Sequence, residues 1–160
     1  MNKLKWILPL FVLTIMLSGC PYASETPIDK AAVKVNPAFL GKWEPKTTSD
    51  EYYLVTKTDE FTYQIEKKGK DVKDKTIYTA YASDVDGTTF LNLKDMQNND
   101  KKFYFYKVEL NGSGSKVVLS PVTENITETF ATSEELKAFF KKYKSLSFFY
   151  SKDVDTYIKD

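Results

Sequence analysis

The chain has 160 residues with 23 basic and 22 acidic side chains, so its formal net charge is +1. This balance excludes the strongly basic surface with which proteins bind nucleic acid. The sequence has no histidine and one cysteine, and therefore no Ser–His or Cys–His pair, no ordinary zinc site and no internal disulfide. The length suits one domain, and 11 Phe with 11 Tyr can supply its core.

The first nineteen residues have the order of a bacterial export signal. Lys3 and Lys5 precede an apolar run over residues 6–17, shorter than the roughly 20 residues of a membrane-spanning helix. The run ends in Leu17-Ser18-Gly19-Cys20, which resembles the lipobox of bacterial lipoproteins. The resemblance implies cleavage before Cys20, a diacylglycerol on its thiol, and often a further acyl chain such as palmitate. The alternative is an ordinary secretory signal that contains a cysteine.

The lipobox resemblance sets the expected domain organisation and location. It implies a lipoprotein signal peptide over residues 1–19, and a lipidated cysteine with a flexible tether over residues 20–37. The tether is expected because residues 21–36 hold two prolines and few large apolar side chains. The folded domain is then 38–160, held by lipid at a membrane of the cell envelope. This would be the outer membrane if the host has one, with the domain facing the periplasm or the exterior.

From residue 39 onwards, hydrophobic side chains alternate with a period of two. Asp86-Gly87 is a strong hairpin signal, because glycine accepts the positive φ of a tight turn. Strands spaced about ten residues apart predict an antiparallel meander, as a barrel or a sandwich. Seven strands are predicted: 41–44, 51–58, 61–67, 76–82, 88–93, 103–110 and 116–122.

The pattern changes to a helical one after residue 131. Thr132 and Glu135 form a capping box, which predicts a helix beginning at residue 133. Its apolar stripe consists of Leu136, Phe139, Phe140 and Tyr143. The segment 146–151 is then predicted as the closing strand, and 155–159 as a short addition.

Gly41-Lys42-Trp43 stands near the first strand. Together with the order of seven strands, one helix and a closing strand, it resembles the Gly-x-Trp signature of the lipocalin-like (calycin) barrels. The resemblance implies a mainly β fold, in which an antiparallel meander closes to a barrel of about eight strands with one C-terminal amphipathic helix packed on it. It also implies that Trp43 plugs the closed end and that a small ligand is bound. The late arginine that packs on the tryptophan in that family has no counterpart, because this chain has no arginine.

The most aromatic stretch supplies candidate binding residues. Phe103 and Phe105 share one face of a predicted strand, and Tyr104 and Tyr106 share the other. One set must therefore meet the helix, a ligand or a partner protein. Inward rings either fill a small eight-stranded barrel or line a cavity in it.

Carboxylates are the remaining candidates for chemistry. Asp84 and Asp86 precede Gly87, but the twelve-residue spacing of a calcium loop is absent, so a turn is expected and no metal site. Glu124 and Glu128 offer a glycosidase-like pair only if the fold brings them together in a cleft.

We therefore expect a non-catalytic, monomeric binding protein without a cofactor. Its partners would be the membrane, through the lipid on Cys20, and a small apolar ligand or an envelope protein. The first alternative is a small inhibitor or exclusion factor that acts through a loop on an envelope enzyme or an incoming agent. The second is a hydrolase that uses carboxylates alone. An apolar cavity above about 300 Å³ would favour ligand binding.

Overall fold

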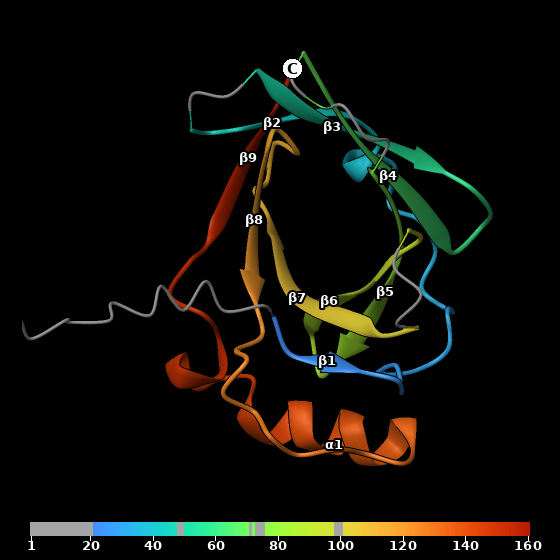
Figure 1. Cartoon of the computed structure of the whole chain (residues 1–160), viewed down its shortest axis with the longest axis vertical. Helices are drawn as coiled ribbons and strands as arrows, with labels where there is room; N and C mark the ends of the chain where they lie inside the picture. The colour runs from blue at the N-terminus through green and yellow to red at the C-terminus, as the bar shows by residue number, and fades with distance from the viewer. Residues whose placement is uncertain (1–20, 48–49, 71, 73–75, 98–100) are drawn as a thin grey trace, which may run out of the picture.

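The alternating segments form eight antiparallel strands that close into a barrel (Figure 1). The computed structural model describes residues 21–47, 50–70, 72, 76–97 and 101–160, so Cys20 and the signal segment lie outside the described residues. The strands of the barrel are β2 (Gly41–Pro45), β3 (Glu51–Lys57), β4 (Thr62–Gly69), β5 (Thr76–Val85), β6 (Thr88–Asp95), β7 (Phe103–Leu110), β8 (Lys116–Pro121) and β9 (Asp155–Lys159). Neighbours in sequence pair along the meander, and β9 pairs with both β2 and β8 to close it.

The hairpin between β5 and β6 forms at the predicted Asp-Gly pair. Asp86 and Gly87 have φ values of 47° and 77°, and the backbone N–H of Gly87 donates to Asp84 Oδ1 at 3.2 Å. Two successive positive φ angles match the turn that suits the twist of a β-hairpin. Asp84 and Asp86 therefore shape a turn in the described structure.

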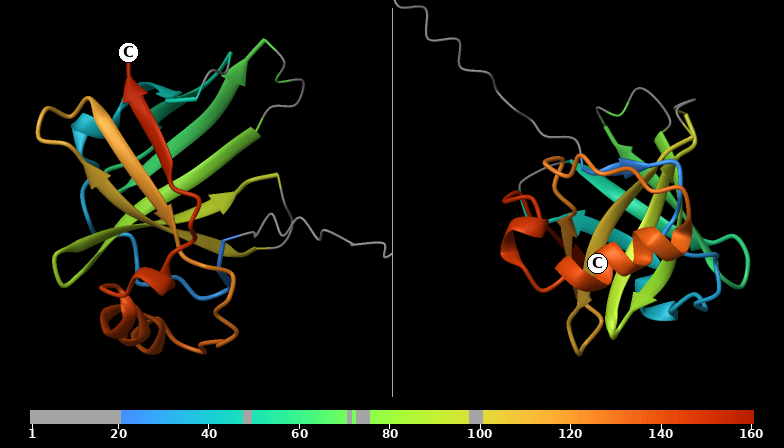
Figure 2. Two further views of the ribbon diagram at one scale, coloured as in Figure 1. Left: turned by 90° about the vertical axis from the view of Figure 1, so that its left-hand side faces the viewer. Right: turned by 90° about the horizontal axis from the view of Figure 1, so that it is seen from below.

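Helix α1 (Ser133–Tyr143) lies outside the barrel wall, as Figures 1 and 2 show. Its predicted cap is present, because Thr132 Oγ1 accepts the backbone N–H of Glu135 at 3.2 Å. Leu136 and Phe140 are buried against the wall, and Phe139 and Tyr143 pack beside them. The mainly β barrel with one packed C-terminal helix is thus confirmed.

The segment 146–151 was wrongly predicted as the closing strand. Ser147–Phe149 form a 3-10 helix, and Tyr150 makes a single β-bridge to Val122. Phe149 is buried against Phe140, with ring centroids 5.1 Å apart. A tight turn directly after α1 returns the chain onto the wall, and β9, expected only as a short addition, closes the barrel.

The flexible tether predicted over residues 20–37 is wrong for the part of it that the structure describes. The two-residue strand β1 (Ala23–Ser24) pairs with the start of β7, and Ile28 is fully buried beneath α1. The backbone N–H of Ile28 donates to Asn92 Oδ1 at 2.9 Å, which satisfies a polar group that burial would otherwise leave unpaired. Apolar side chains too widely spaced to show a pattern hold this segment against the wall.

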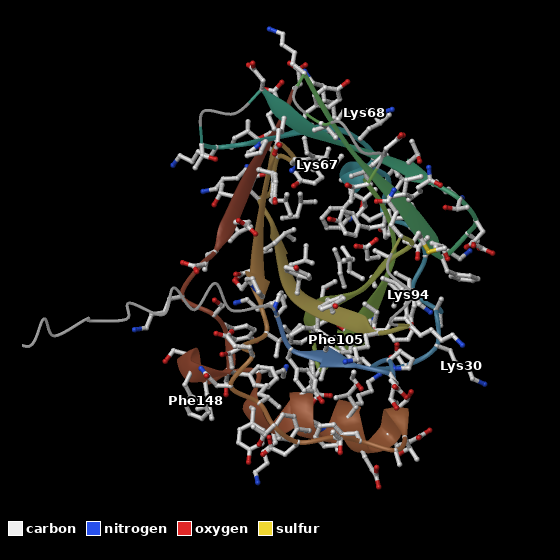
Figure 3. The ribbon with its side chains drawn as sticks, viewed as in Figure 1. Lys30, Lys67, Lys68, Lys94, Phe105 and Phe148 are labelled. Atoms are coloured by element: carbon white, nitrogen blue, oxygen red, sulfur yellow. The ribbon has the colours of Figure 1, made fainter. Side chains whose placement is uncertain are left out.

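Two hydrophobic cores lie on opposite faces of the barrel wall. The outer core is buried between the wall, the N-terminal segment and α1 (Figure 3). It consists of Tyr22, Ile28, Val85, Phe90, Phe105, Val122, Leu136, Phe140 and Phe149. The inner core lies inside the barrel and is smaller, with Trp43, Val108 and Val117 buried at its centre.

Candidate binding cavity

A cavity of about 250 Å³ occupies the barrel interior. All eight strands contribute to its lining, because alternate residues of each strand point inward. Most of the lining is aliphatic or aromatic, and its polar atoms come mainly from five tyrosines and one carboxylate. These residues are Tyr53, Tyr63, Tyr78, Tyr106, Tyr157 and Asp155. The volume is below the 300 Å³ that we set as a criterion, yet the barrel is not filled.

Trp43 borders this cavity and is held on both sides. Its indole Nε1–H donates to the carbonyl oxygen of Phe39 at 2.8 Å, and only 3% of the residue is exposed. Phe39 ends the 3-10 helix Pro37–Phe39 and also lines the cavity. Lys159 Nζ lies 5.4 Å from the centroid of the Trp43 ring, within the range of a cation–π contact.

Gly41 meets the same lysine. It has a φ of 121°, a conformation that favours glycine, and a Cβ built there would lie 3.3 Å from Lys159 Cε. Lys159 Nζ also donates to the carbonyl oxygen of Ala38 at 2.8 Å. Lys159, from the last strand, thus contacts the Trp43 ring, the backbone at Ala38 and the space beside Gly41.

The aromatic stretch of β7 divides between the two faces of the wall. Phe105 is fully buried in the outer core, with its ring centroid 5.2 Å from that of Phe140. Phe103 packs against the same core. Tyr106 lines the cavity, and Tyr104 pairs with Leu93, another cavity residue, so that both belong to the inner face. One ring set therefore meets the helix and the other faces the interior.

Asp155 is the carboxyl group of the cavity lining, at the end of the barrel where β9 begins. It is exposed to solvent at this end, which we call the mouth. Burial of its carboxyl against the lining and the neighbouring Asp153 both raise the pKa of Asp155. The negative charge of Asp155 in turn adds to the burial that raises the pKa values of Tyr53, Tyr106 and Tyr157. Tyr53, Tyr106 and Tyr157 line the same cavity as Asp155 and keep their hydroxyl protons at neutral pH.

Lys67 and Glu51 form an ion pair on the same inner face. Lys67 is opposite Tyr53 in the register of β3 and β4, and its Nζ lies 2.8 Å from Glu51 Oε2. Hydrogen bonding to Glu51 is the main cause that raises the pKa of Lys67. The positive charge of Lys67 is therefore already paired with the Glu51 carboxylate.

The other carboxylates proposed from sequence lie elsewhere. Glu124 and Glu128 are exposed in the connection between β8 and α1, and neither lines the cavity. Asp86 pairs with Lys141 of α1 at 3.0 Å. Among the described residues no group of three acidic, histidine or cysteine side chains is placed to hold a metal ion.

The lysines of α1 are also engaged with the protein. Lys137 pairs with Asp29 at 2.7 Å, and Lys144 donates to the carbonyl oxygen of Asp86 at 2.7 Å. These contacts join the helix to the N-terminal segment and to the β5–β6 turn. Within the described ranges, no helix has the length and apolar character needed to cross a membrane.

Sequence reasoning found the aromatic residues of β7 but missed Asp155 and the tyrosines from the other strands. The period-two pattern of residues 155–159 could have indicated Asp155, because Asp155 and Tyr157 lie on the same face of a strand. No family model matches the chain, and no curated protein or solved structure matches it either.

Proposed function

We propose that this chain is an envelope-anchored bacterial lipoprotein whose barrel binds a small, largely apolar ligand without catalysis. The observation that carries the proposal is the cavity of about 250 Å³ inside the closed barrel. An apolar interior with a few convergent polar groups is the usual character of a small-molecule site. A single carboxyl group among the described lining residues is a poor basis for the two-carboxylate hydrolase, which needs a pair about 5–9 Å apart.

The Lys159 contact supports a fixed barrel end beside Trp43, and the solvent-exposed Asp155 supports entry at the mouth. A ligand of the size of the cavity would contact side chains from several strands. The apolar rings and aliphatic groups would supply most of the affinity, and the tyrosine hydroxyls would orient it.

Binding is tested by filling the cavity from β8. Leu119 lines it, whereas the neighbouring Val118 pairs with Glu109 and Thr156 on the outer face. The full chain, held in a non-ionic amphipol, is titrated with the neutral probe 3,3-dimethylbutan-1-ol and followed by calorimetry and NMR. We expect Leu119→Trp to abolish binding and Val118→Trp to preserve it. Equal binding by both variants, or no binding by the unaltered chain, would refute the proposal.

The anchor is tested separately through Cys20. Replacement by serine removes the thiol that would carry the diacylglycerol. Cys20→Ser should therefore abolish incorporation of labelled fatty acid and release the protein from the membrane fraction, because stable anchoring requires two or more acyl chains. Unchanged membrane retention would refute the lipoprotein assignment and leave the binding proposal intact.

A further inference from the structure

The chemistry of the mouth is that of one negative charge among aromatic rings. Asp155 and Tyr157 occupy successive inward positions of β9, opposite Leu119 and Val117 of β8. Tyr157 packs edge-to-face on Tyr53, with ring centroids 5.4 Å apart. Tyr106 of β7 lines the same cavity, and the Asp155 charge adds to the burial that raises the pKa of its hydroxyl.

The carboxyl group of Asp155 makes no salt bridge within the part of the chain that the structure describes. The like charge of Asp153 acts on it and raises its pKa. Asp155 lines the cavity and is also exposed at the mouth, so an entering cation could pair with its carboxylate directly. It is therefore a group that a positively charged ligand would satisfy.

The other charged groups at this end of the barrel lie outside the cavity lining. Lys67 is paired with Glu51. Asp95, the last residue of β6, stands opposite Tyr78 of β5, and its charge contributes to the raised pKa of that tyrosine. Of these charged side chains, Asp155 is the one that lines the cavity. An anionic ligand in the cavity would meet the like charge of Asp155.

We propose that the ligand of the cavity is a small organic cation, a quaternary or protonated amine whose charged group lies between the Asp155 carboxylate and the rings of Tyr53 and Tyr157. This proposal rests on the proposed binding function and narrows its ligand class. The electron-rich faces of tyrosine attract ammonium groups, and the Asp155 carboxylate adds a charge-assisted contact. The cavity volume, smaller than the roughly 300–1,000 Å³ of drug-sized sites, suits an amine with short alkyl groups.

The test compares two probes of the same shape. Choline carries a quaternary nitrogen where 3,3-dimethylbutan-1-ol carries a carbon, so only the charge differs. The full chain in non-ionic amphipol is titrated with each by calorimetry. We expect choline to bind about tenfold more tightly or better, the order of gain seen for desolvated cation–π and charge contacts.

Two variants separate the charge of Asp155 from the rest of the site. Asp155→Asn keeps the shape and removes the charge, and Asp153→Asn is the matched control outside the cavity lining. Asp155→Asn should reduce choline affinity about tenfold while changing that of the alcohol less than about twofold, and Asp153→Asn should change both little. A melting curve for each variant verifies that it is folded, and Tyr157→Leu provides a second measure, since it should weaken choline more than the alcohol.

The outcomes separate this inference from the function on which it rests. Binding of the alcohol with no preference for choline would overturn the cation proposal and leave the binding function standing. Undiminished choline affinity in Asp155→Asn would also overturn it. Failure of both probes to bind would refute both proposals. A choline preference that disappears in Asp155→Asn and persists in Asp153→Asn would establish it.

Discussion

The two faces of the barrel wall are built from the same strands and packed in opposite ways. On the outer face, fully buried rings such as Phe90, Phe105 and Phe140 meet edge-to-face, with ring centroids about 5 Å apart. On the inner face, Trp43, Val108 and Val117 are buried around a space of about 250 Å³. The largest fully buried side chains thus lie outside the barrel, and we expect this outer packing to supply most of the stability while the interior stays hollow.

Polar groups follow the same division. Under the N-terminal segment, Asn92 is fully buried, donates to Ser83 Oγ at 2.8 Å and accepts the N–H of Ile28. Ser83 in turn donates to Asp29, which pairs with Lys137. On the inner face, Asp155 is left without an ion pair among the described residues. The hydrogen-bonded network around Asn92 favours one packing of the N-terminal segment, whereas the Asp155 carboxylate can still pair with a ligand.

The largest effect is expected for the outer core. Phe140→Ala removes a fully buried ring that contacts Phe90, Phe105 and Phe149. We expect a loss of about 3–5 kcal/mol in the free energy of unfolding, because the tightly packed surroundings cannot collapse into the void. Urea unfolding followed by circular dichroism measures it. A loss under about 1 kcal/mol would show that the helix contributes little to stability.

A smaller effect is expected for the polar network. Asn92→Ala leaves the buried N–H of Ile28 without its acceptor and should cost about 1–3 kcal/mol. It should also raise hydrogen exchange at Ile28. The exposed Asn125 provides the control, since Asn125→Ala should change stability by less than about 0.5 kcal/mol. Equal effects of the two substitutions would mean that Asn92 does not hold the N-terminal segment.

The inner face should tolerate truncation better. Leu93 lines the cavity and is only partly buried, so Leu93→Ala enlarges an existing space rather than creating a closed one. We expect a cost of roughly 1–2 kcal/mol, below the usual 2–5 kcal/mol for a closed core. Urea unfolding beside Phe140→Ala gives the comparison directly. A loss equal to that of Phe140→Ala would remove the distinction between the two cores.

The smallest effect is a pH-dependent one at Asp155. Its pKa in the folded protein lies above the unfolded value, so the folded state binds the proton more tightly. Stability therefore falls as the pH rises from the unfolded pKa through the folded pKa, and remains reduced above it. Asp155→Asn does not lose stability in this way as the pH rises. Without ligand, the variant should therefore be slightly more stable than the unaltered chain at pH 7, and of similar stability at pH 3. A lower melting temperature for the variant at pH 7 would contradict the sign.

The features that could be predicted from the sequence are those set by interactions between residues close together along the chain. The strands, the Asp86-Gly87 turn and the cap at Thr132 are set by neighbours within a few residues, and these predictions are confirmed. The burial of Ile28 depends on Asn92, 64 residues further along the chain, and no local pattern reveals it. The segment 146–151 was ambiguous because two successive phenylalanines fit either a strand or a turn, and the fold exposes Phe148 while burying Phe149.

The site was predictable only in part for the same reason. Alternation assigned the rings of β7 to two faces, and the structure bears out that division. The volume left in the interior depends on the summed side chains of eight strands, which no single segment determines. Asp155 becomes notable only beside Tyr53 and Tyr106, two strands brought to it by barrel closure.

The position of β9 has a consequence for how the chain is made. This strand supplies the seam, pairing with β2 on one side and β8 on the other. Until residues 155–159 have been synthesised, both neighbours are open edges with unpaired backbone groups, the kind of surface through which chains aggregate. The barrel therefore cannot close until β9 has been synthesised, after the other strands and α1. Any truncation that removes it would leave a curved open sheet without an enclosed interior.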